Sequence, residues 1–257
     1  MSKIKAVLID LSGTLHIDND PTPGAVAALT KLQATPGLKL RYVTNTTNES
    51  KRALMERLTN IGFMDVTEDK VFTSLSAART LLENQELRAY FLVDKNAMED
   101  FKGISEEDPN AVVVGLAPEE FAYENLNKAM RLLHNDAKLI AIHKARYYQR
   151  KDGRALGPGP FVAALEYASD VQATVVGKPS EKFFLSAIAE FGCSPQECVM
   201  IGDDVRDDVG GAQAAGMHGI LVKTGKYREG DESKISPSPF RVVDNFAEAV
   251  EVIQTML

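Results

Sequence analysis

Short runs of apolar residues alternate along the chain with segments in which apolar positions recur every three or four residues. The runs are rich in Val, Ile and Leu and predict buried strands, whereas the recurring pattern predicts amphipathic helices. Strands that are apolar on both faces and separated by helices are typical of a doubly wound α/β fold with a parallel sheet. The predicted strands are 5–10, 38–45, 70–74, 89–94, 111–116, 139–144, 173–178, 198–203 and 218–225, and the predicted helices are 23–34, 48–62, 76–85, 121–135, 159–169, 181–192, 208–216 and 246–257.

The middle of the chain differs from its two ends. Residues 75–175 hold strands and helices of their own, together with the most basic stretch of the sequence, 143–154. About 100 residues are enough for a small separate domain. We therefore expect a domain inserted at 75–175 into a core that is built from residues 1–74 and 176–257.

Composition and charge exclude several kinds of partner. The 257 residues are 44% apolar and 25% charged, with a net charge of −7. An acidic chain is a poor partner for nucleic acid and for anionic membranes. No apolar run approaches the ~18 residues of a membrane span, and the N-terminus lacks a signal-peptide cleavage site. The sequence predicts a cytoplasmic enzyme that binds neither nucleic acid nor membranes.

The two cysteines, Cys193 and Cys198, are candidates for a metal site or for packed free thiols. A thiolate metal site needs further cysteine or histidine ligands, and the neighbouring sequence offers none. Free thiols are therefore the favoured interpretation.

Polar residues stand where several predicted strands end. Asp10 follows the first apolar run, Thr44 and Asn45 follow the second, Lys178 follows a later one, and Asp203 begins an acidic cluster. Each alone has an ordinary explanation as a helix cap, a turn residue or a solvated charge. Ligands of parallel sheets bind beyond the carboxyl ends of the strands. We therefore expect these residues to meet at one edge of one sheet.

Together the residues offer the chemistry of phosphoryl transfer. Asp10 and Asp203 are hard oxygen ligands of the kind that Mg²⁺ prefers. Lys178, Thr44 and backbone N–H groups around Gly13 are donors for phosphoryl oxygens. Asp10 could then attack phosphorus and form an aspartyl phosphate. A glycine after the nucleophile lets the backbone approach the phosphate closely.

These motifs resemble those of the haloacid dehalogenase-like (HAD) hydrolase superfamily. The resemblance implies a Rossmann-like core, a class-II cap at the inserted domain, Mg²⁺ as cofactor, and a homodimer. It also implies a small phosphorylated substrate or a phosphoamino-acid side chain. The matching residues are Asp10-Leu11-Ser12-Gly13-Thr14-Leu15, Thr44-Asn45, Gly177-Lys178-Pro179, and Gly202-Asp203 with Asp208.

The resemblance also implies a role for each residue. Asp10 would be the nucleophile and a Mg²⁺ ligand, with the Ser12 backbone carbonyl and Asp203 as further ligands. Asp208 would hold a metal-bound water or orient Lys178. The residues expected to contact the substrate are Asp10, Leu11, Ser12, Thr44, Asn45 and Lys178, of which Asp10, Ser12 and Lys178 are the catalytic candidates.

Ser12 departs from the Asp-x-Asp pattern of the family's phosphatases, in which the second Asp acts as general acid and base. General acid–base catalysis contributes about 10²–10⁴ in rate. Its loss matters most for poor leaving groups, so Ser12 favours phosphoramidate, pyrophosphate and aryl phosphate substrates. The alternative is a weakly active or non-catalytic protein that binds phosphate or a partner. A dehalogenase also uses an Asp nucleophile, but it gains little from an acidic metal site.

Several other residues carry weaker signals. His143, Lys144, Arg146, Arg150, Lys151 and Arg154 could bring positive charge to the site, or form a solvated hairpin of the inserted domain. We expect Asp204 and Asp207 to act as charges at a helix N-terminus, 157–160 to form a turn before a helix, and His16, His134 and His218 to be structural.

Overall fold

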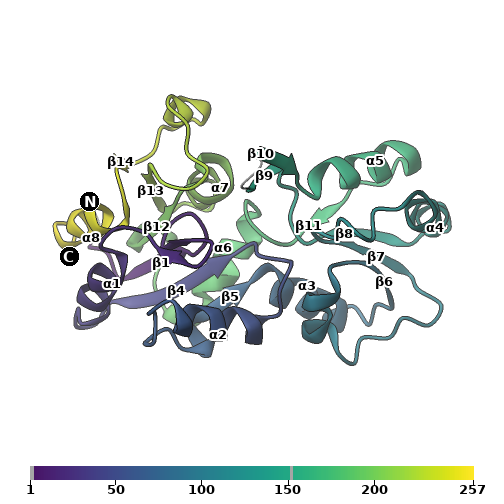
Figure 1. Ribbon diagram of the computed structural model, residues 1–257, viewed down its shortest axis with the longest axis horizontal. Helices are drawn as coiled ribbons and strands as arrows, with labels where there is room; N and C mark the ends of the chain where they lie inside the picture. The colour runs from purple at the N-terminus through teal and green to yellow at the C-terminus, as the bar shows by residue number, and fades with distance from the viewer. Residues whose placement is uncertain (1–2, 151–152) are drawn as a thin grey trace. The chain divides into compact units, whose positions relative to one another are not determined.

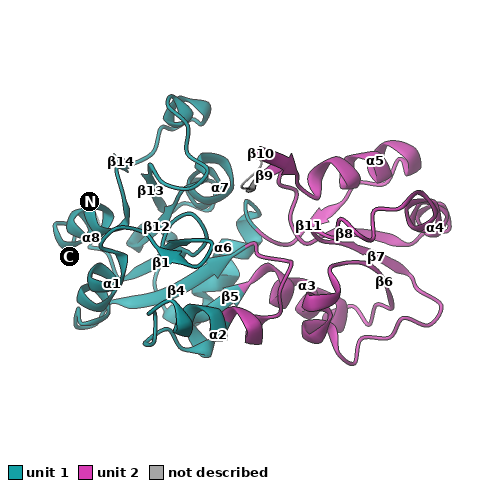
Figure 2. Ribbon diagram, in the orientation of Figure 1, with its two compact units in different colours: residues 1–44, 55–72, 178–257 teal, residues 45–54, 73–177 magenta. Residues whose placement is uncertain are grey.

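The protein is described here by a computed structural model that covers residues 3–150 and 153–257 (Figure 1). The chain forms two compact units (Figure 2). The first unit contains residues 1–44, 55–72 and 178–257, and the second contains 45–54 and 73–177. The chain therefore passes between the units four times.

The first unit is built around a parallel sheet. Its strand order is β14-β13-β12-β1-β4-β5, and the pairs from β14 through to β4 are parallel. Every residue of β1 and β12 is buried, so both faces of the sheet centre are covered. The strands are β1 (Ala6–Asp10), β4 (Lys39–Thr44), β5 (Val71–Thr73), β12 (Cys198–Gly202), β13 (His218–Val222) and β14 (Arg241–Val243).

The helices around this sheet include one that spans both units. Helix α2 begins in residues assigned to the second unit and ends in the first. Helices α1 and α8 pack against each other, as do α6 and α7. A two-stranded hairpin of β2 (His16–Ile17) and β3 (Asp20–Pro21) follows β1. The helices are α1 (Ala25–Gln33), α2 (Lys51–Asn60), α6 (Glu181–Ile188), α7 (Gly211–Ala214) and α8 (Phe246–Gln254), with the π-helix η5 (Val205–Gly210) and the 3-10 helices η1 (Glu68–Lys70), η3 (Ala189–Phe191), η4 (Pro195–Glu197) and η6 (Asp231–Lys234).

The second unit has its own parallel sheet, with the order β11-β8-β7-β6. All four residues of β7 are buried, which again places apolar side chains against both faces. The strands are β6 (Ala89–Leu92), β7 (Ala111–Val114), β8 (Lys138–Ala141) and β11 (Thr174–Val175), with a hairpin of β9 (Tyr147–Arg150) and β10 (Gly153–Leu156); the helices are α3 (Ser74–Asn84), α4 (Tyr123–His134), α5 (Gly159–Ser169) and the 3-10 helix η2 (Lys95–Phe101).

The doubly wound parallel α/β class predicted from the sequence is confirmed. The differences lie at short elements. The predicted helix at 208–216 is a π-helix followed by a four-residue α-helix, and the predicted strand at 173–178 keeps only two paired residues. Within the described ranges, no helix is long and apolar enough to cross a membrane.

Candidate active site

Asp10 is the last residue of β1, the strand between β4 and β12. Its backbone lies beside Val43 of β4, and its side chain is 4% exposed. The hydroxyl of Thr14 donates a hydrogen bond to Asp10 Oδ2 at 3.1 Å. A run of apolar side chains therefore holds a carboxylate at the carboxyl end of the sheet, as the sequence pattern predicted.

Asp203 and Asp208 come from the end of β12 and from the π-helix after it. Asp204 caps this helix by accepting hydrogen bonds from the backbone of Arg206 and Asp207, both at 3.0 Å. Its own backbone N–H donates to Asp208 Oδ2 at 3.0 Å. A π-helical turn holds more residues than an α-helical turn. With the chain in this conformation, both Asp203 and Asp208 are buried.

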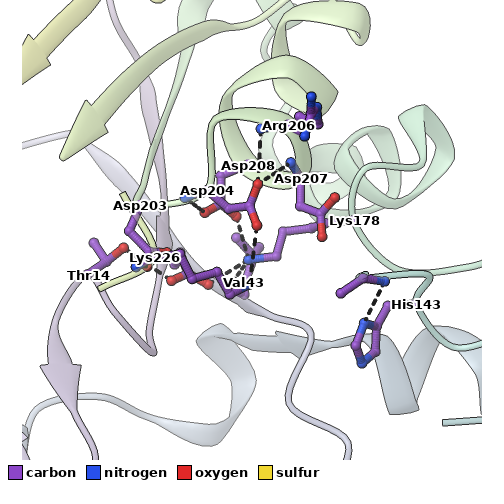
Figure 3. A network of polar contacts seen from close by, with 12 residues as sticks. Thr14, Val43, His143, Lys178, Asp203, Asp204, Arg206, Asp207, Asp208 and Lys226 are labelled. Carbon is purple, nitrogen blue, oxygen red and sulfur yellow. Dashed lines mark hydrogen bonds and ion pairs between the residues drawn. The ribbon is translucent and has the colours of Figure 1, made fainter. Parts of the chain in front are cut away.

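Lys178 pairs with the carboxylates of Asp10 and Asp208 (Figure 3). Its Nζ lies 2.5 Å from Asp10 Oδ1 and 2.6 Å from Asp208 Oδ1, and it also donates to the carbonyl oxygen of Val43 at 3.4 Å. The sequence placed Lys178 after a strand of the same sheet, and this is wrong. The strand before it, β11, belongs to the sheet of the second unit, and Lys178 is the first residue after the chain returns to the first unit.

The three carboxylates of Asp10, Asp203 and Asp208 form a compact acidic cluster. One oxygen from each lies within 4.8 Å of the others, and in the part of the chain that the structure describes no other group of three Asp, Glu, His or Cys side chains meets this criterion. When all three are ionised, they and Lys178 carry a net charge of −2. Burial and the charge of Asp10 raise the pKa of Asp203 well above its ordinary value.

The pKa values of neighbouring ionisable groups are also shifted by burial and by the charges of the cluster. Burial and the charge of Asp204 raise the pKa of Asp207 to about 7. Burial raises the pKa of Asp208 to about 6, against the opposing effect of the Lys178 charge. Burial alone would lower the pKa of Lys178, but Asp10 and Asp208 outweigh it and the net shift is upward. Lys178 is therefore an ammonium ion throughout the physiological pH range.

Gly13 lets the backbone pass next to Asp203. Its φ of 93° lies in the left-handed region, and a Cβ at this position would collide with the Asp203 carboxylate. The sequence predicted a glycine here for the approach of a phosphate. The structure gives a different reason, since a larger side chain would displace a member of the acidic cluster.

The segment after β13 is a part of the site that the sequence analysis missed. The backbone N–H of Lys226 donates to Asp203 Oδ2 at 2.6 Å, and its Nζ pairs with Asp204 Oδ2 at 3.3 Å. Thr224 donates its hydroxyl to the carbonyl oxygen of Gly13. The sequence did contain a signal for this segment. Polar residues, Thr-Gly-Lys, follow the apolar run of β13, which ends at the same edge of the sheet as the strands before Asp10 and Asp203.

The remaining predicted site residues are placed as follows. Leu11 is buried and Ser12 is exposed, directly after Asp10. Thr44 is buried at the end of β4 in the first unit. Asn45 belongs to the second unit, where its Oδ1 lies 2.5 Å from the position that a Cβ on Gly177 would occupy.

Three residues of the basic stretch at 143–154 have contacts within the second unit. Lys144 forms an ion pair of 2.5 Å with Glu166, and the Arg154 guanidinium lies 4.6 Å from the centre of the Tyr147 ring. His143 is buried beside Thr47, 3.5 Å from its hydroxyl. Lys151 lies outside the described residues. Strands β9 and β10 form the hairpin, and a role of this stretch in bringing positive charge to the site stays a prediction.

The other weaker signals are accounted for by local structure. Residues 157 and 158 precede α5, whereas 159 and 160, which the sequence placed in the turn, are the first two residues of the helix. His134 Nε2 lies 3.1 Å from the Ala168 carbonyl oxygen, His16 lies beside Arg57, and His218 packs on Phe240. The two cysteines are free thiols.

Comparison with known proteins places the chain in a family. The model of the haloacid dehalogenase-like hydrolases matches residues 7–105, and a HAD-hydrolase-like model matches 175–249. The chain is 62% identical over 255 residues to the haloacid dehalogenase-like hydrolase domain-containing protein 2 of Bos taurus, covering 99% of this chain and 98% of that one. It is 39% identical over 257 residues to a phospholysine phosphohistidine inorganic pyrophosphate phosphatase of Xenopus laevis, covering 97% and 94%.

Solved structures agree with this placement. A 4-nitrophenylphosphatase of Thermotoga maritima superposes with a TM-score of 0.88 at 27% identity, over 98% of both chains. A glycerol phosphate phosphatase of Mycobacterium tuberculosis, solved in complex with magnesium, gives 0.82 at 26% identity, over 96% of this chain and 78% of that one. The chain belongs to the haloacid dehalogenase-like hydrolase family.

Proposed function

We propose that this protein is a Mg²⁺-dependent phosphohydrolase that acts through an aspartyl phosphate on Asp10. The observation that carries the proposal is the buried cluster of Asp10, Asp203 and Asp208, in which the Lys178 ammonium group pairs with Asp10 and Asp208. Relatives with phosphatase names and similar structures support the same reaction class. A buried, charged cluster at the carboxyl edge of a parallel sheet is a common setting for catalysis.

The residues of the cluster fit a small dication. The donors are carboxylate oxygens, which Mg²⁺ prefers, and the net charge of −2 is what a dication neutralises. Burial, followed by the charge of Asp10, raises the pKa of Asp203, and a bound dication would offset the negative charge. Asp10, Asp203 and the Ser12 carbonyl are the proposed ligands. When bound, Mg²⁺ would neutralise charge on the phosphoryl oxygens and on the carboxylates.

The proposed reaction has two steps on Asp10. A carboxylate oxygen of Asp10 forms a bond to phosphorus while the bond to the leaving group breaks, and water then hydrolyses the aspartyl phosphate. Lys178 is proposed to stabilise the phosphoryl charge, with Asp208 keeping the ammonium group in position at 2.6 Å. Thr14 orients Asp10 through its hydroxyl. Leu11, Ser12, Thr44 and Asn45 are proposed to contact the phosphoryl group.

Ser12 leads us to propose substrates with stable leaving groups. A serine hydroxyl does not titrate in the range of a general acid, so the leaving group must depart with little help. Phosphoramidates, pyrophosphate and aryl phosphates meet this requirement. A relative named for phospholysine, phosphohistidine and pyrophosphate, and another named for 4-nitrophenyl phosphate, support this class.

The inserted region is proposed to act as a cap that excludes water and discriminates between substrates. Residues 73–177 form most of a compact unit with its own sheet, which supports a separate role. Dimer formation and the cytoplasmic location stay predictions.

The proposal is tested by measuring phosphate release from phosphohistidine, pyrophosphate, 4-nitrophenyl phosphate and an alkyl phosphate. We expect activity with Mg²⁺ on the first three, and loss of that activity with excess EDTA that added Mg²⁺ restores. The Asp203→Asn variant is expected to need a higher Mg²⁺ concentration for half-maximal activity. Equal activity with and without EDTA would contradict metal dependence.

Ser12 also favours a second candidate, a protein that binds a phosphate-bearing partner without turning it over. The acidic cluster would then serve binding alone. This candidate predicts Mg²⁺-dependent binding of phosphorylated compounds with no phosphate release from any of the four. Release at a rate that scales with enzyme concentration and falls in Asp10→Asn would exclude it.

The stabilisation of the protein by Mg²⁺ is expected to grow as the pH rises. Asp207 and Asp208 have pKa values of about 7 and about 6, above the ordinary 3.8. Between pH 3.8 and about pH 7, the folded chain binds more protons at these two residues than the unfolded chain does. The free energy of unfolding of the metal-free protein therefore falls as the pH rises. The pKa of the proposed ligand Asp203 is also raised, by burial and by the charge of Asp10, so a rising pH frees this carboxylate for the metal.

The measurement is the melting temperature with EDTA and with Mg²⁺, at roughly pH 5.5 and pH 8. The increase caused by Mg²⁺ should be larger at the higher pH. Asp203→Asn is the control and should show little increase at either pH. An increase that does not depend on pH would contradict the coupling.

A further inference from the structure

Cys193 and Cys198 lie in contact in the first unit, away from the acidic cluster. Their sulfur atoms are 3.5 Å apart. Cys198 is the first residue of β12 and is buried, whereas Cys193 lies between η3 and η4 and is partly exposed. The pair therefore combines one accessible thiol with one that solvent does not reach.

The chain between the two cysteines is held in a defined turn. Ser194 and Glu197 form a capping box around η4, with the Ser194 backbone N–H donating to Glu197 at 2.9 Å. Lys5 holds Glu197 from outside the turn through an ion pair of 2.6 Å. The Cys198 thiol donates to the carbonyl oxygen of Ser194 at 3.3 Å. The contact between the sulfurs thus follows from an ordered backbone.

We propose that Cys193 and Cys198 form an oxidation site at which a peroxide converts the two thiols into an intrachain disulfide. A disulfide has an S–S bond of about 2.05 Å, so the two sulfurs must approach each other by about 1.5 Å. Cys193 is partly exposed and lies outside the helices and strands. Its side chain can therefore make that movement while Cys198 stays in the strand.

The reaction balances in two steps. The Cys193 sulfur, as its thiolate, attacks one peroxide oxygen, the O–O bond breaks, hydroxide leaves, and a sulfenic acid forms. The Cys198 sulfur then attacks the Cys193 sulfur, the S–O bond breaks, and the departing hydroxyl takes the Cys198 proton and leaves as water. The two sulfurs together give two electrons to the peroxide.

The environments of the two thiols assign these roles. Burial, followed by the hydrogen bond to Cys193, raises the pKa of Cys198, so this thiol stays protonated and is a poor first nucleophile. Cys193 is the thiol that an oxidant in solution can reach. Cys198 is then held against the sulfenic acid and resolves it before a second peroxide can oxidise it further.

The site lies at the opposite end of β12 from Asp203. The strand has five residues, so at ~3.3 Å per residue the two positions are on the order of 16 Å apart. We therefore expect the disulfide to form without removing any group of the acidic cluster. This inference does not depend on the proposed function.

The test treats the full chain with hydrogen peroxide and follows intact mass and thiol content. We expect a loss of about 2 Da and of both free thiols, reversed by dithiothreitol, with peptide mapping showing a link between residues 193 and 198. The Cys198→Ala variant should instead accumulate a sulfenic acid at Cys193 that dimedone captures. Cys193→Ser should leave Cys198 unmodified.

The proposal is overturned if the unaltered chain gains oxygen at Cys193 while Cys198 stays alkylatable after unfolding. A disulfide that links two chains would also overturn it. Both outcomes are read from the unaltered protein, so they do not depend on whether a variant folds.

Discussion

Replacing Asp10 with Asn is expected to lower the turnover of every phosphorylated substrate by at least about 10⁴-fold, because an amide cannot form the proposed aspartyl phosphate. The fold should survive the change. Asp10 lies in a cluster with excess negative charge, and its own charge contributes to the raised pKa of Asp203. In Asp10→Asn, Lys178 keeps its ion pair with Asp208. Removing one carboxylate therefore relieves repulsion while leaving the ammonium group paired.

The measurements are phosphate release, circular dichroism and the melting temperature in EDTA. Beryllium fluoride, a mimic of a phosphoryl group on a carboxylate, should raise the melting temperature of the parent but not of Asp10→Asn. The surface variant Asp65→Asn makes the same chemical change at an exposed position and serves as the control. Turnover that persists in Asp10→Asn would assign the nucleophile to another residue.

Replacing Ser12 with Asp is expected to increase kcat/KM for alkyl phosphates by up to about 10²–10⁴, equivalent to about 3–5 kcal/mol of activation free energy. Ser12 is exposed, so a carboxylate at this position need not be buried. Activated substrates should gain less, because their leaving groups depart with little help. The full gain requires the new carboxyl group to be aligned with the leaving group. Repulsion between this carboxylate and Asp10 lowers the expected gain.

The diagnostic measurement is log(kcat/KM) against leaving-group pKa, which reports formation of the aspartyl phosphate. The slope should be steep in the parent and shallower in Ser12→Asp. Ser12→Asn has nearly the same shape without an acid, and it should keep the parent slope. A flat line for the parent, or an equal gain for all substrates, would mean that another group supplies the proton.

The same change should alter the second step of the reaction. The parent lacks a carboxylate at position 12 to act as general base for hydrolysis of the aspartyl phosphate. We therefore expect activated substrates to give a rapid burst of leaving group followed by slow turnover. In Ser12→Asp the burst should shrink as hydrolysis accelerates. Equal bursts in both proteins would contradict a role for position 12 in hydrolysis.

The fold was largely predictable from sequence because its central strands are apolar on both faces. The runs that became β1 and β12 are buried at every residue, a pattern that leaves little choice of structure. Short elements were harder to predict from the sequence. The edge strand β14 has three residues, and the π-helix η5 depends on hydrogen bonds of Asp204 and Asp208 that no local propensity encodes.

The clearest signal of the site was a carboxylate that follows a buried strand. Asp10 and Asp203 carry that signal, and the structure brings them together, although their roles stay predictions. Lys178 reaches them by a route that the sequence did not show, since the strand before it belongs to another sheet. Lys226 binds Asp203 through its backbone N–H, a contact that any residue except proline could make.

The position of Lys178 at a junction has an evolutionary consequence. Asp10, Lys178, Asp203 and Asp208 all belong to one unit, and the long segment between residues 73 and 177 ends immediately before Lys178. Neither partner of the Lys178–Asp10 and Lys178–Asp208 ion pairs lies in that segment, so a change within it replaces no member of the cluster. Selection can therefore remodel the segment for new ligands without replacing a residue of the acidic cluster.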